Sequence, residues 1–335
     1  MKNVLYVGNA LSQKGKNLTS VEILSARLRQ FSKVKIASSK QNKLLRILDM
    51  VLLVLKNARS TDYLLIDTYS TVNFYYAFII SQISRMLKIN YIPILHGGNL
   101  EKRLIQNPKL SMMVFDNAYR LVSPSNFLKE TFKNYGYQDV EYIPNTIEII
   151  DFEFFNRDIE IIKLFWLRSF SKIYNPALAV LILDSLIKKG YNTELCMVGP
   201  DSDGSLKEVK QLVKQLDLNV KFTGKLSKNA WIELSKDYNI FINTTNFDNT
   251  PVSVIEAMAL GLPVVSTEVG GLPYLISHNE DGLLVPPNDV DAMVNAIIKL
   301  KEDQNLKNKL AINARKKVEK FDWNEVKVKW EKLLS

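Results

Sequence analysis

The sequence predicts an α/β protein with two Rossmann-like domains. Short apolar runs alternate with segments of helical periodicity from the first residues onward, which is the pattern of parallel βαβ units. The chain has 335 residues, 47% of them hydrophobic, which is enough for two separate cores. No low-complexity linker divides the chain. From the order of the strand-like and helical segments we expect an N-terminal domain over 1–148, a connector over 149–160 and a second domain over 161–321.

Six strands are expected in the N-terminal domain, near residues 3–7, 33–37, 62–67, 90–95, 119–123 and 139–143. Helices fill the intervals, and the first begins after Thr19 and Ser20, which are favourable N-cap residues. Segment 39–59 combines basic ends with a broad apolar face. It is either a helix that packs on the core or an amphipathic helix on an anionic membrane surface, and we favour the core-facing helix.

The second domain begins with a strand over 161–167. Further strand-like runs are 193–198, 220–223, 238–243, 263–266 and 281–285. The tail 322–335 has apolar residues at helical spacing, which predicts one apolar helix face formed by Trp323, Val326, Trp330, Leu333 and Leu334.

The most informative stretch is the polar turn Asn246 to Asn249 and the helix after it. It follows an apolar run, so the turn lies at the carboxyl end of a strand, where open α/β sheets bind ligands. Thr250 is expected as N-cap and Pro251 as the first helical residue. Glu256 lies four residues into this helix from Val252, and its side chain leans back toward the helix start.

Asp248 and Glu256 can therefore face one ligand. Free amides at a helix N-terminus suit a diphosphate, and nearby carboxylates accept hydrogen bonds from sugar hydroxyls. The alternative is an ordinary strand, turn and helix, in which Asp248 forms the turn and Glu256 is solvated.

The segment Glu256 to Val264 reads Glu-Ala-Met-Ala-Leu-Gly-Leu-Pro-Val and is followed by the turn Gly270-Gly271. This arrangement, with an acidic residue at Asp248, resembles the retaining glycosyltransferases of family 4. The resemblance implies the GT-B fold, in which two Rossmann-like domains face each other across a cleft and the C-terminal helix, here 322–335, crosses back to the first domain. Asp248 stands where that family usually has Glu, and Pro251 where many members have Gly.

The resemblance also assigns roles to residues of the second domain. Glu256 would bind the ribose hydroxyls and Asp248 the hydroxyls of the donor sugar. The amides of Val252 and Ser253, with Thr250 beside them, would meet the diphosphate.

Two further loops of the second domain match the family in the same way. Arg168 and Lys172 follow the first strand of the second domain, and they would stabilise the departing diphosphate. Gly224 and Lys225 resemble the loop that reads the nucleotide base through backbone groups. Outside this family, Arg168 and Lys172 would be two exposed basic residues.

In the N-terminal domain, His96 follows a strand and precedes two glycines. By resemblance it would lie near the donor sugar and the acceptor, and it is one of only two histidines. His278 is expected in a polar turn without a catalytic role. Gly15 and Lys16, in the loop after the first strand, would face the donor diphosphate and the acceptor; a solvated loop is the alternative.

The composition of the chain limits the classes of partner that we expect it to bind. Lys and Arg number 44 against 35 Asp and Glu, a formal charge of +9, which favours nucleotide diphosphates, nucleic acid or an anionic membrane surface. The basic residues are scattered without a recognition-helix or zinc signature, so no nucleic-acid partner is expected. The one cysteine, Cys196, lies in an apolar run and is expected to be buried. Asp201 and Asp203 are interpreted as turn residues, and no metal is expected.

These inferences predict a metal-independent retaining hexosyltransferase. It would need no cofactor besides its UDP-sugar or GDP-sugar donor, and its acceptor would be a glycan or a lipid-linked glycan in surface polysaccharide synthesis. We expect it in the cytoplasm, because neither the N-terminus nor segment 44–55 has the length of a signal peptide core or a membrane span. The resemblance implies peripheral contact at the inner membrane face, where members of the family often extend glycans. The alternatives are a sugar-nucleotide epimerase of the same fold and, less favoured, a basic nucleic-acid-binding protein.

Overall fold

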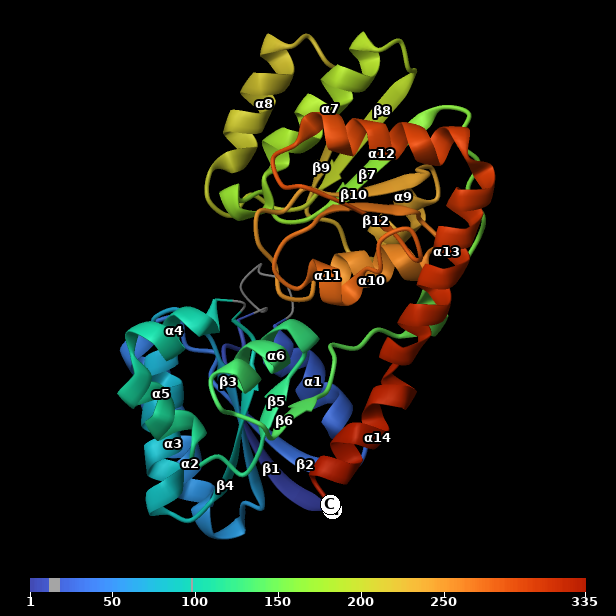
Figure 1. Ribbon diagram of the computed structural model, residues 1–335. Helices are drawn as coiled ribbons and strands as arrows, with labels where there is room; N and C mark the ends of the chain where they lie inside the picture. Colours follow the sequence, from blue (N-terminus) through green and yellow to red (C-terminus); the bar gives the residue numbers. More distant parts are fainter. Residues whose placement is uncertain (12–18, 98) are drawn as a thin grey trace. The chain divides into compact units, whose positions relative to one another are not determined.

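The computed structural model describes residues 1–11, 19–97 and 99–335, which form two compact units (Figure 1). Unit 1 comprises Met1–Pro144 and Asn324–Ser335, and unit 2 comprises Asn145–Trp323. None of the helices in the described ranges is both long and apolar enough to cross a membrane.

Unit 1 is built on a parallel sheet that has six strands within the described residues, in the order β2-β1-β3-β4-β5-β6. The strands are β1 (Lys2–Val7), β2 (Ser32–Ala37), β3 (Tyr63–Thr68), β4 (Asn90–Leu95), β5 (Leu121–Ser123) and β6 (Val140–Tyr142). All six predicted strands are confirmed, with ends shifted by at most two residues. Their carboxyl ends share one edge of the sheet because every pair is parallel.

The helices of unit 1 are α1 (Ser20–Leu28), α2 (Lys43–Asn57), α3 (Phe74–Met86), α4 (Leu100–Gln106), α5 (Pro108–Phe115) and α6 (Asn126–Asn134). Thr19 is the N-cap of α1, as predicted, and its hydroxyl and backbone N–H both donate to Glu22. Helices α2, α3, α4 and α5 gather along one flank of the sheet (Figure 1).

Helix α2 packs on the core with only one of its sides, so the prediction of a core-facing helix is confirmed for that side alone. Met50 and Val54 are buried in the core between the sheet and α3. Five leucines on the same helix are exposed, which a purely core-facing helix does not explain.

Unit 2 has a second parallel sheet of six described strands, in the order β12-β11-β10-β7-β8-β9. They are β7 (Ile162–Leu167), β8 (Thr193–Val198), β9 (Lys221–Gly224), β10 (Ile240–Asn243), β11 (Val264–Thr267) and β12 (Leu283–Val285). Alternate strand residues enter two cores, so that Leu164 and Trp166 pack on one face and Phe165 on the other. The sheet is therefore buried on both faces, as in doubly wound folds. Cys196 on β8 is buried, as predicted.

The helices of unit 2 are α7 (Pro176–Lys188), α8 (Ser205–Gln215), α9 (Lys228–Ser235), α10 (Val252–Ala259), α11 (Leu272–Leu275), α12 (Val290–Glu302) and α13 (Gln304–Val318). Helix α10 ends as predicted: Gly261 follows its last turn with φ +76°, a conformation that favours glycine.

The segment expected as a connector packs within unit 2. Phe152 and Ile159 are buried in the two cores of that unit. Residues 149–160 therefore lie on unit 2, since their apolar side chains are satisfied there.

The two stretches where the chain passes between units lie side by side. Ile147 donates its N–H to Phe321 O at 3.0 Å and accepts from Trp323 N at 3.1 Å. Helix α14 (Trp323–Leu333) follows, and residues 324–335 group with unit 1. Val326 and Trp330 on this helix are buried, as is Leu334 directly after it.

Candidate active site

The predicted site residues of unit 2 come from loops at one edge of its sheet. Arg168 follows β7, Gly224 ends β9, Asp248 lies after β10 and Gly270 follows β11. Because all these strands are parallel, their carboxyl ends meet at the edge where doubly wound sheets bind ligands.

Arg168 and Asp248 are in direct contact. The Nη2 of Arg168 forms an ion pair with Asp248 Oδ2, and both side chains are 14% exposed. The Arg168 guanidinium also lies over the Tyr174 ring, 4.0 Å from its centroid, and its Nη1 is 3.5 Å from the hydroxyl of Ser253. Burial lowers the pKa of Arg168, while Tyr174 acts in the opposite direction.

Two close backbone approaches hold this contact. A Cβ on Gly199, after β8, would lie 1.8 Å from Arg168 O. A Cβ on Gly271 would lie 1.6 Å from Asn249 O, and the Gly271 N–H donates to Asp248 O at 2.9 Å. Glycine at both positions therefore lets neighbouring loops support the residues on either side of the ion pair.

The start of α10 differs from the prediction by one residue. Pro251 is the N-cap, with φ −70° and ψ 115°, and the helix begins at Val252, so Thr250 is not the cap and Pro251 is not the first helical residue. Proline supplies no capping side chain. The first helical amides bonded to a carbonyl are those of Val254 and Ile255, which donate to Pro251 O, so Ser253 and Val252 present the open N-terminal amides.

Glu256 lies one turn into α10. Burial raises the pKa of its carboxyl to about 7, and the charge of Lys228 acts in the opposite direction. Among the described residues the structure gives its carboxylate no hydrogen bond. Such a group is suited to accept hydrogen bonds from ligand hydroxyls.

Lys172 is not brought to Arg168. It begins a 3₁₀ turn, Lys172–Tyr174, and its ammonium lies 3.5 Å from Glu208 on α8, with 73% of the side chain exposed. Its backbone N–H donates to Asp203 instead, at 2.9 Å. The Lys172 side chain is therefore paired with α8 in this structure, and its role at the departing diphosphate stays a prediction.

Gly224 and Lys225 lie at the edge strand of unit 2. Gly224 has φ +69° and its carbonyl accepts from Gly199 N at 2.9 Å, which links this loop to the one beside Arg168. The Lys225 side chain is exposed.

The aspartates of the Asp201-Asp203 turn bind backbone and hydroxyl groups. Asp201 accepts from Gly204 N, and Asp203 accepts from Ser171, Lys172 and Ser205. The pKa of Asp203 is lowered by these hydrogen bonds, first by that of Ser205. Within the described part of the chain, no group of three or more His, Cys, Asp and Glu could hold a metal ion.

In unit 1, His96 is held at the carboxyl end of β4 by a buried carboxylate that the sequence reasoning did not include. Its Nε2 lies 2.8 Å from Asp67 Oδ1, which also accepts from the Tyr6 hydroxyl at 2.6 Å. Tyr69 stacks on the imidazole with 5.5 Å between ring centroids. Burial, and then the charge of Asp67, raise the pKa of Tyr6, so this hydroxyl stays a donor to Asp67.

Because a carboxylate only accepts, the Asp67 contact places the imidazole proton on Nε2 and leaves Nδ1 as acceptor in the neutral ring. His278, by contrast, accepts from Leu284 N at 3.0 Å within its turn, as expected of a structural histidine. Gly15 and Lys16 lie outside the described residues.

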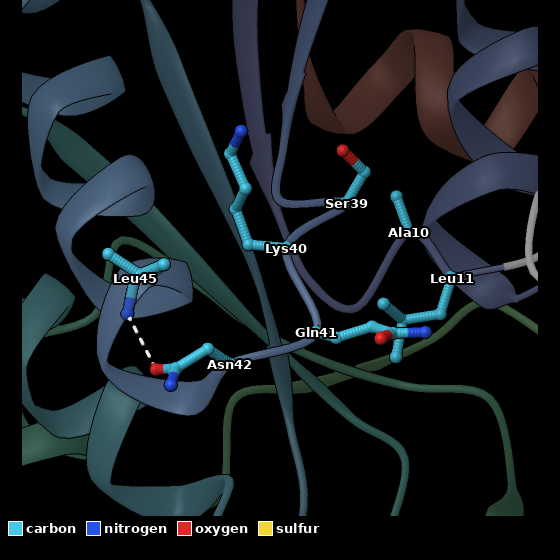
Figure 2. A pocket seen from close by; sticks show the side chains of 7 residues that line it. All are labelled: Ala10, Leu11, Ser39, Lys40, Gln41, Asn42 and Leu45. Atoms are coloured by element: carbon cyan, nitrogen blue, oxygen red, sulfur yellow. Dashed lines mark hydrogen bonds between the residues drawn. The ribbon is translucent and has the colours of Figure 1, made fainter.

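A pocket of about 200 Å³ opens between the segments that follow β1 and β2 and the start of α2 (Figure 2). It is lined by Ala10, Leu11, Ser39, Lys40, Gln41, Asn42 and Leu45. Asn42 is the N-cap of α2 and accepts from the amides of Leu44 and Leu45.

Arg157 is a further residue with a structural role that the sequence did not predict. Its buried guanidinium donates to the carbonyls of Ser235, Tyr238 and Leu260, the last being the C-cap of α10. It therefore fixes the far end of the helix whose start carries Ser253.

The chain is similar to known proteins in both sequence and structure. The family model described as "Glycosyl transferases group 1" matches residues 149–317. The capsular polysaccharide biosynthesis glycosyltransferase CapM of Staphylococcus aureus is 31% identical over 152 residues, which are 45% of this chain and 39% of CapM. A probable sucrose-phosphate synthase 2 of Craterostigma plantagineum is 40% identical over 91 residues, 27% of this chain and only 8% of that protein.

Solved structures resemble the whole chain. Sucrose-phosphate synthase from Thermosynechococcus elongatus superposes with a TM-score of 0.80 at 16% identity, covering 99% of this chain and 98% of that one. Anabaena Alr3699/HepE in complex with UDP gives 0.79 at 17% identity, covering 100% and 99%. At such identities the likeness establishes the fold, the GT-B arrangement of two parallel Rossmann-like sheets. With a family model that matches half of its length, the chain belongs to the glycosyl transferases group 1 family.

Proposed function

We propose that this protein is a retaining glycosyltransferase that moves a hexose from a nucleoside-diphosphate sugar to a glycan or lipid-linked glycan in surface polysaccharide synthesis. The observation that carries the proposal is the grouping of Arg168, Asp248, Ser253 and Glu256 around the open N-terminus of α10. This grouping combines a cation and free amides for a diphosphate with carboxylates for sugar hydroxyls.

Unit 2 would bind the donor. The amides of Val252 and Ser253, with Thr250 beside them, meet the diphosphate, and Glu256 accepts hydrogen bonds from the ribose. The loop Gly224-Lys225 takes the base. HepE structures solved with UDP and with UDP-glucose support a uridine donor for a protein of this fold, with a GDP-sugar as the alternative.

Unit 1, residues 1–148 with the helix 322–335, would bind the acceptor, near which His96 acts. Gly15 and Lys16 are proposed to meet donor and acceptor from the loop after β1. The enzyme is proposed to work in the cytoplasm at the inner membrane face.

The reaction would occur on one face of the donor sugar. The acceptor hydroxyl oxygen bonds to the anomeric carbon as the bond from that carbon to the diphosphate oxygen breaks. The electron pair stays on the diphosphate, whose departing oxygen also takes the acceptor proton. Arg168 stabilises the charge that develops there, and Lys172 would do so only after leaving Glu208.

Asp248 would bind hydroxyls of the donor sugar. Its ion pair with Arg168 means that a diphosphate and Asp248 would compete for the same guanidinium. Donor binding would therefore free Asp248 for the sugar as Arg168 turns to phosphate.

The proposal is tested by Arg168→Ala and Glu256→Gln, with sugar transfer measured over a panel of nucleotide sugars. Arg168→Ala is expected to lower kcat by about 100-fold to 1000-fold. Glu256→Gln is expected to weaken donor binding, seen as lost thermal stabilisation by UDP. Glu280→Gln, an exposed carboxylate paired with Lys309, is the matched control. Intact transfer in both site variants would overturn the assignment.

Two further measurements separate the alternatives. Conversion of the donor to an epimer without acceptor, detected by NMR, would indicate an epimerase. Transfer that vanishes with a chelator and returns with manganese would contradict metal independence.

A further inference from the structure

Helix α2 carries an apolar face on its outer side. Leu44, Leu45, Leu48, Leu52 and Leu55 are between 49% and 74% exposed, and we call these five side chains the leucine face. Their spacing of three and four residues places them along one side of the helix, over about 17 Å of its length. Contiguous exposed leucines of this kind mark an interaction surface.

The leucine face is not the core-packing side of α2. Met50 and Val54, a turn apart, fill the core, and Arg46 is anchored beside them through hydrogen bonds to Lys40 O, Gln41 O and Asn9 Oδ1. The helix is therefore already fixed in unit 1 by its opposite side. The leucines add nothing to that packing and are available to a partner.

The surroundings of the leucine face are strongly basic. Residues 39–60, 72–88 and 100–115, which contain α2 to α5, hold ten basic and two acidic residues, a net +8 against +9 for the whole chain. These helices contact one another in a row, α2 with α3, α3 with α5 and α5 with α4, along one flank of the sheet (Figure 1). The flank that exposes the leucines therefore carries a net positive charge.

We propose that the leucine face docks on an anionic phospholipid membrane, with α2 lying in the plane of the interface. Lys43 and Lys56 bracket the leucines and are exposed, so they would meet lipid phosphates while the leucines enter the acyl boundary. A helix of 15 residues, about 22 Å long, is too short to span the bilayer but suits an interfacial position.

Charge decides against a second copy of the chain as the partner. Two leucine faces brought together would place two basic flanks in contact, and like charges at an interface oppose association. An anionic membrane supplies both the apolar interior and the opposite charge.

Membrane docking would also explain how the enzyme reaches its acceptor. Only this link to a lipid-linked acceptor rests on the proposed function. The pocket of Figure 2 adjoins the leucine face through Leu45 and offers Lys40 and Ser39 beside it. A glycan carried on a lipid would therefore reach unit 1 along the surface that holds the enzyme.

Vesicle flotation tests the docking with the full-length protein. The wild type is expected to float with vesicles of phosphatidylcholine mixed with phosphatidylglycerol and to stay unbound with phosphatidylcholine alone. The double variant Leu48→Ser/Leu52→Ser should lose at least about tenfold in partitioning. The matched control Leu181→Ser/Ile187→Ser removes exposed apolar residues from α7 of unit 2 and should float like the wild type.

A charge variant, Lys43→Glu/Lys56→Glu, should weaken flotation and reduce its dependence on salt. Thermal stabilisation by UDP shows, independently of flotation, that a variant is folded and binds its donor. A variant that loses flotation but keeps this stabilisation therefore supports the docking, whatever the acceptor is. Wild type that fails to float, or a leucine-face variant that floats unchanged, would overturn it. A dimer in light scattering that Leu48→Ser/Leu52→Ser dissociates, without flotation, would assign the face to a second copy instead.

Discussion

Nε2 of His96 lies 2.8 Å from Oδ1 of Asp67, where β3 and β4 approach their carboxyl ends. Asp67 is fully buried and His96 is only 10% exposed at its side chain, so little water competes for this contact. The carboxylate fixes both the ring orientation and the tautomer of the only described histidine that the proposed reaction uses. Asp67 is therefore a positioning residue for His96.

Replacing Asp67 with Asn is expected to lower kcat by about tenfold to a hundredfold, because an amide can donate or accept and no longer fixes the imidazole. The KM for the donor should be unchanged, since the donor is assigned to unit 2. Nitrogen chemical shifts of His96 report the tautomer directly. Tyr6→Phe removes the other donor to the same carboxylate oxygen and keeps the His96 contact, so it should cost less. Equal losses in both variants would mean that Asp67 acts only through stability.

Asp248→Asn separates the ion pair from the sugar contact. Without the competing charge, Arg168 should bind UDP roughly three- to tenfold more tightly, the equivalent of ~1 kcal/mol. Sugar transfer should fall, because an amide binds the donor hydroxyls less well than a carboxylate does. Calorimetry with UDP and a transfer assay measure the two effects. Unchanged UDP affinity would show that the ion pair does not compete with the diphosphate.

Glu256 makes stability depend on pH. Its folded pKa of about 7 lies above the ordinary value of 4.5, so between these pH values the folded state binds more protons than the unfolded state. Stability should therefore fall as pH rises from about 4.5 to about 7, by up to ~3 kcal/mol. Urea unfolding of the wild type and Glu256→Gln at pH 5 and pH 8 checks this. The variant should gain relative to the wild type only at pH 8.

The same carboxyl should make donor binding depend on pH in the opposite sense. Ribose hydroxyls donate best to the ionised form, so UDP affinity should rise as pH increases through about 7. A flat profile in the wild type, matching that of Glu256→Gln, would remove Glu256 from the ribose site.

Arg157→Met tests the anchor of α10. Three buried carbonyls, those of Ser235, Tyr238 and Leu260, would lose their donor, which is expected to cost unit 2 about 3 kcal/mol. Tryptophan fluorescence during urea unfolding follows the loss, since Trp166 and Trp231 lie in this unit. Leu181→Met, on an exposed position of α7, should unfold as the wild type does.

The strands were predictable because each is a short apolar run closed by polar residues, and the parallel pattern followed from the helices between them. Asp67 was not predictable as the partner of His96, although it ends such a run. Its role depends on the pairing of β3 with β4, in which Asp67 lies opposite Ile94, and periodicity carries no information on register.

Side-chain direction limited the site prediction in the same way. The sequence between Arg168 and Lys172 predicts a loop after the first strand of unit 2, and the structure has this loop at the edge of the sheet. A 3₁₀ turn then sends the Lys172 ammonium to Glu208, and that turn has no clear sequence signal. At α10, the extended ψ of Pro251 moved the helix start by one residue, because proline adopts the N-cap geometry without a capping side chain.

The division of unit 1 into two pieces of chain has a consequence for biosynthesis. Residues 324–335 are translated only after all of unit 2, yet Tyr63 donates its hydroxyl to Ser335 O and Lys329 lies over the Tyr142 ring. The surface of unit 1 that receives Trp330 and Leu334 therefore stays uncovered on the ribosome while unit 2 folds. Unit 2, whose chain is continuous, is the first of the two that can complete its native packing.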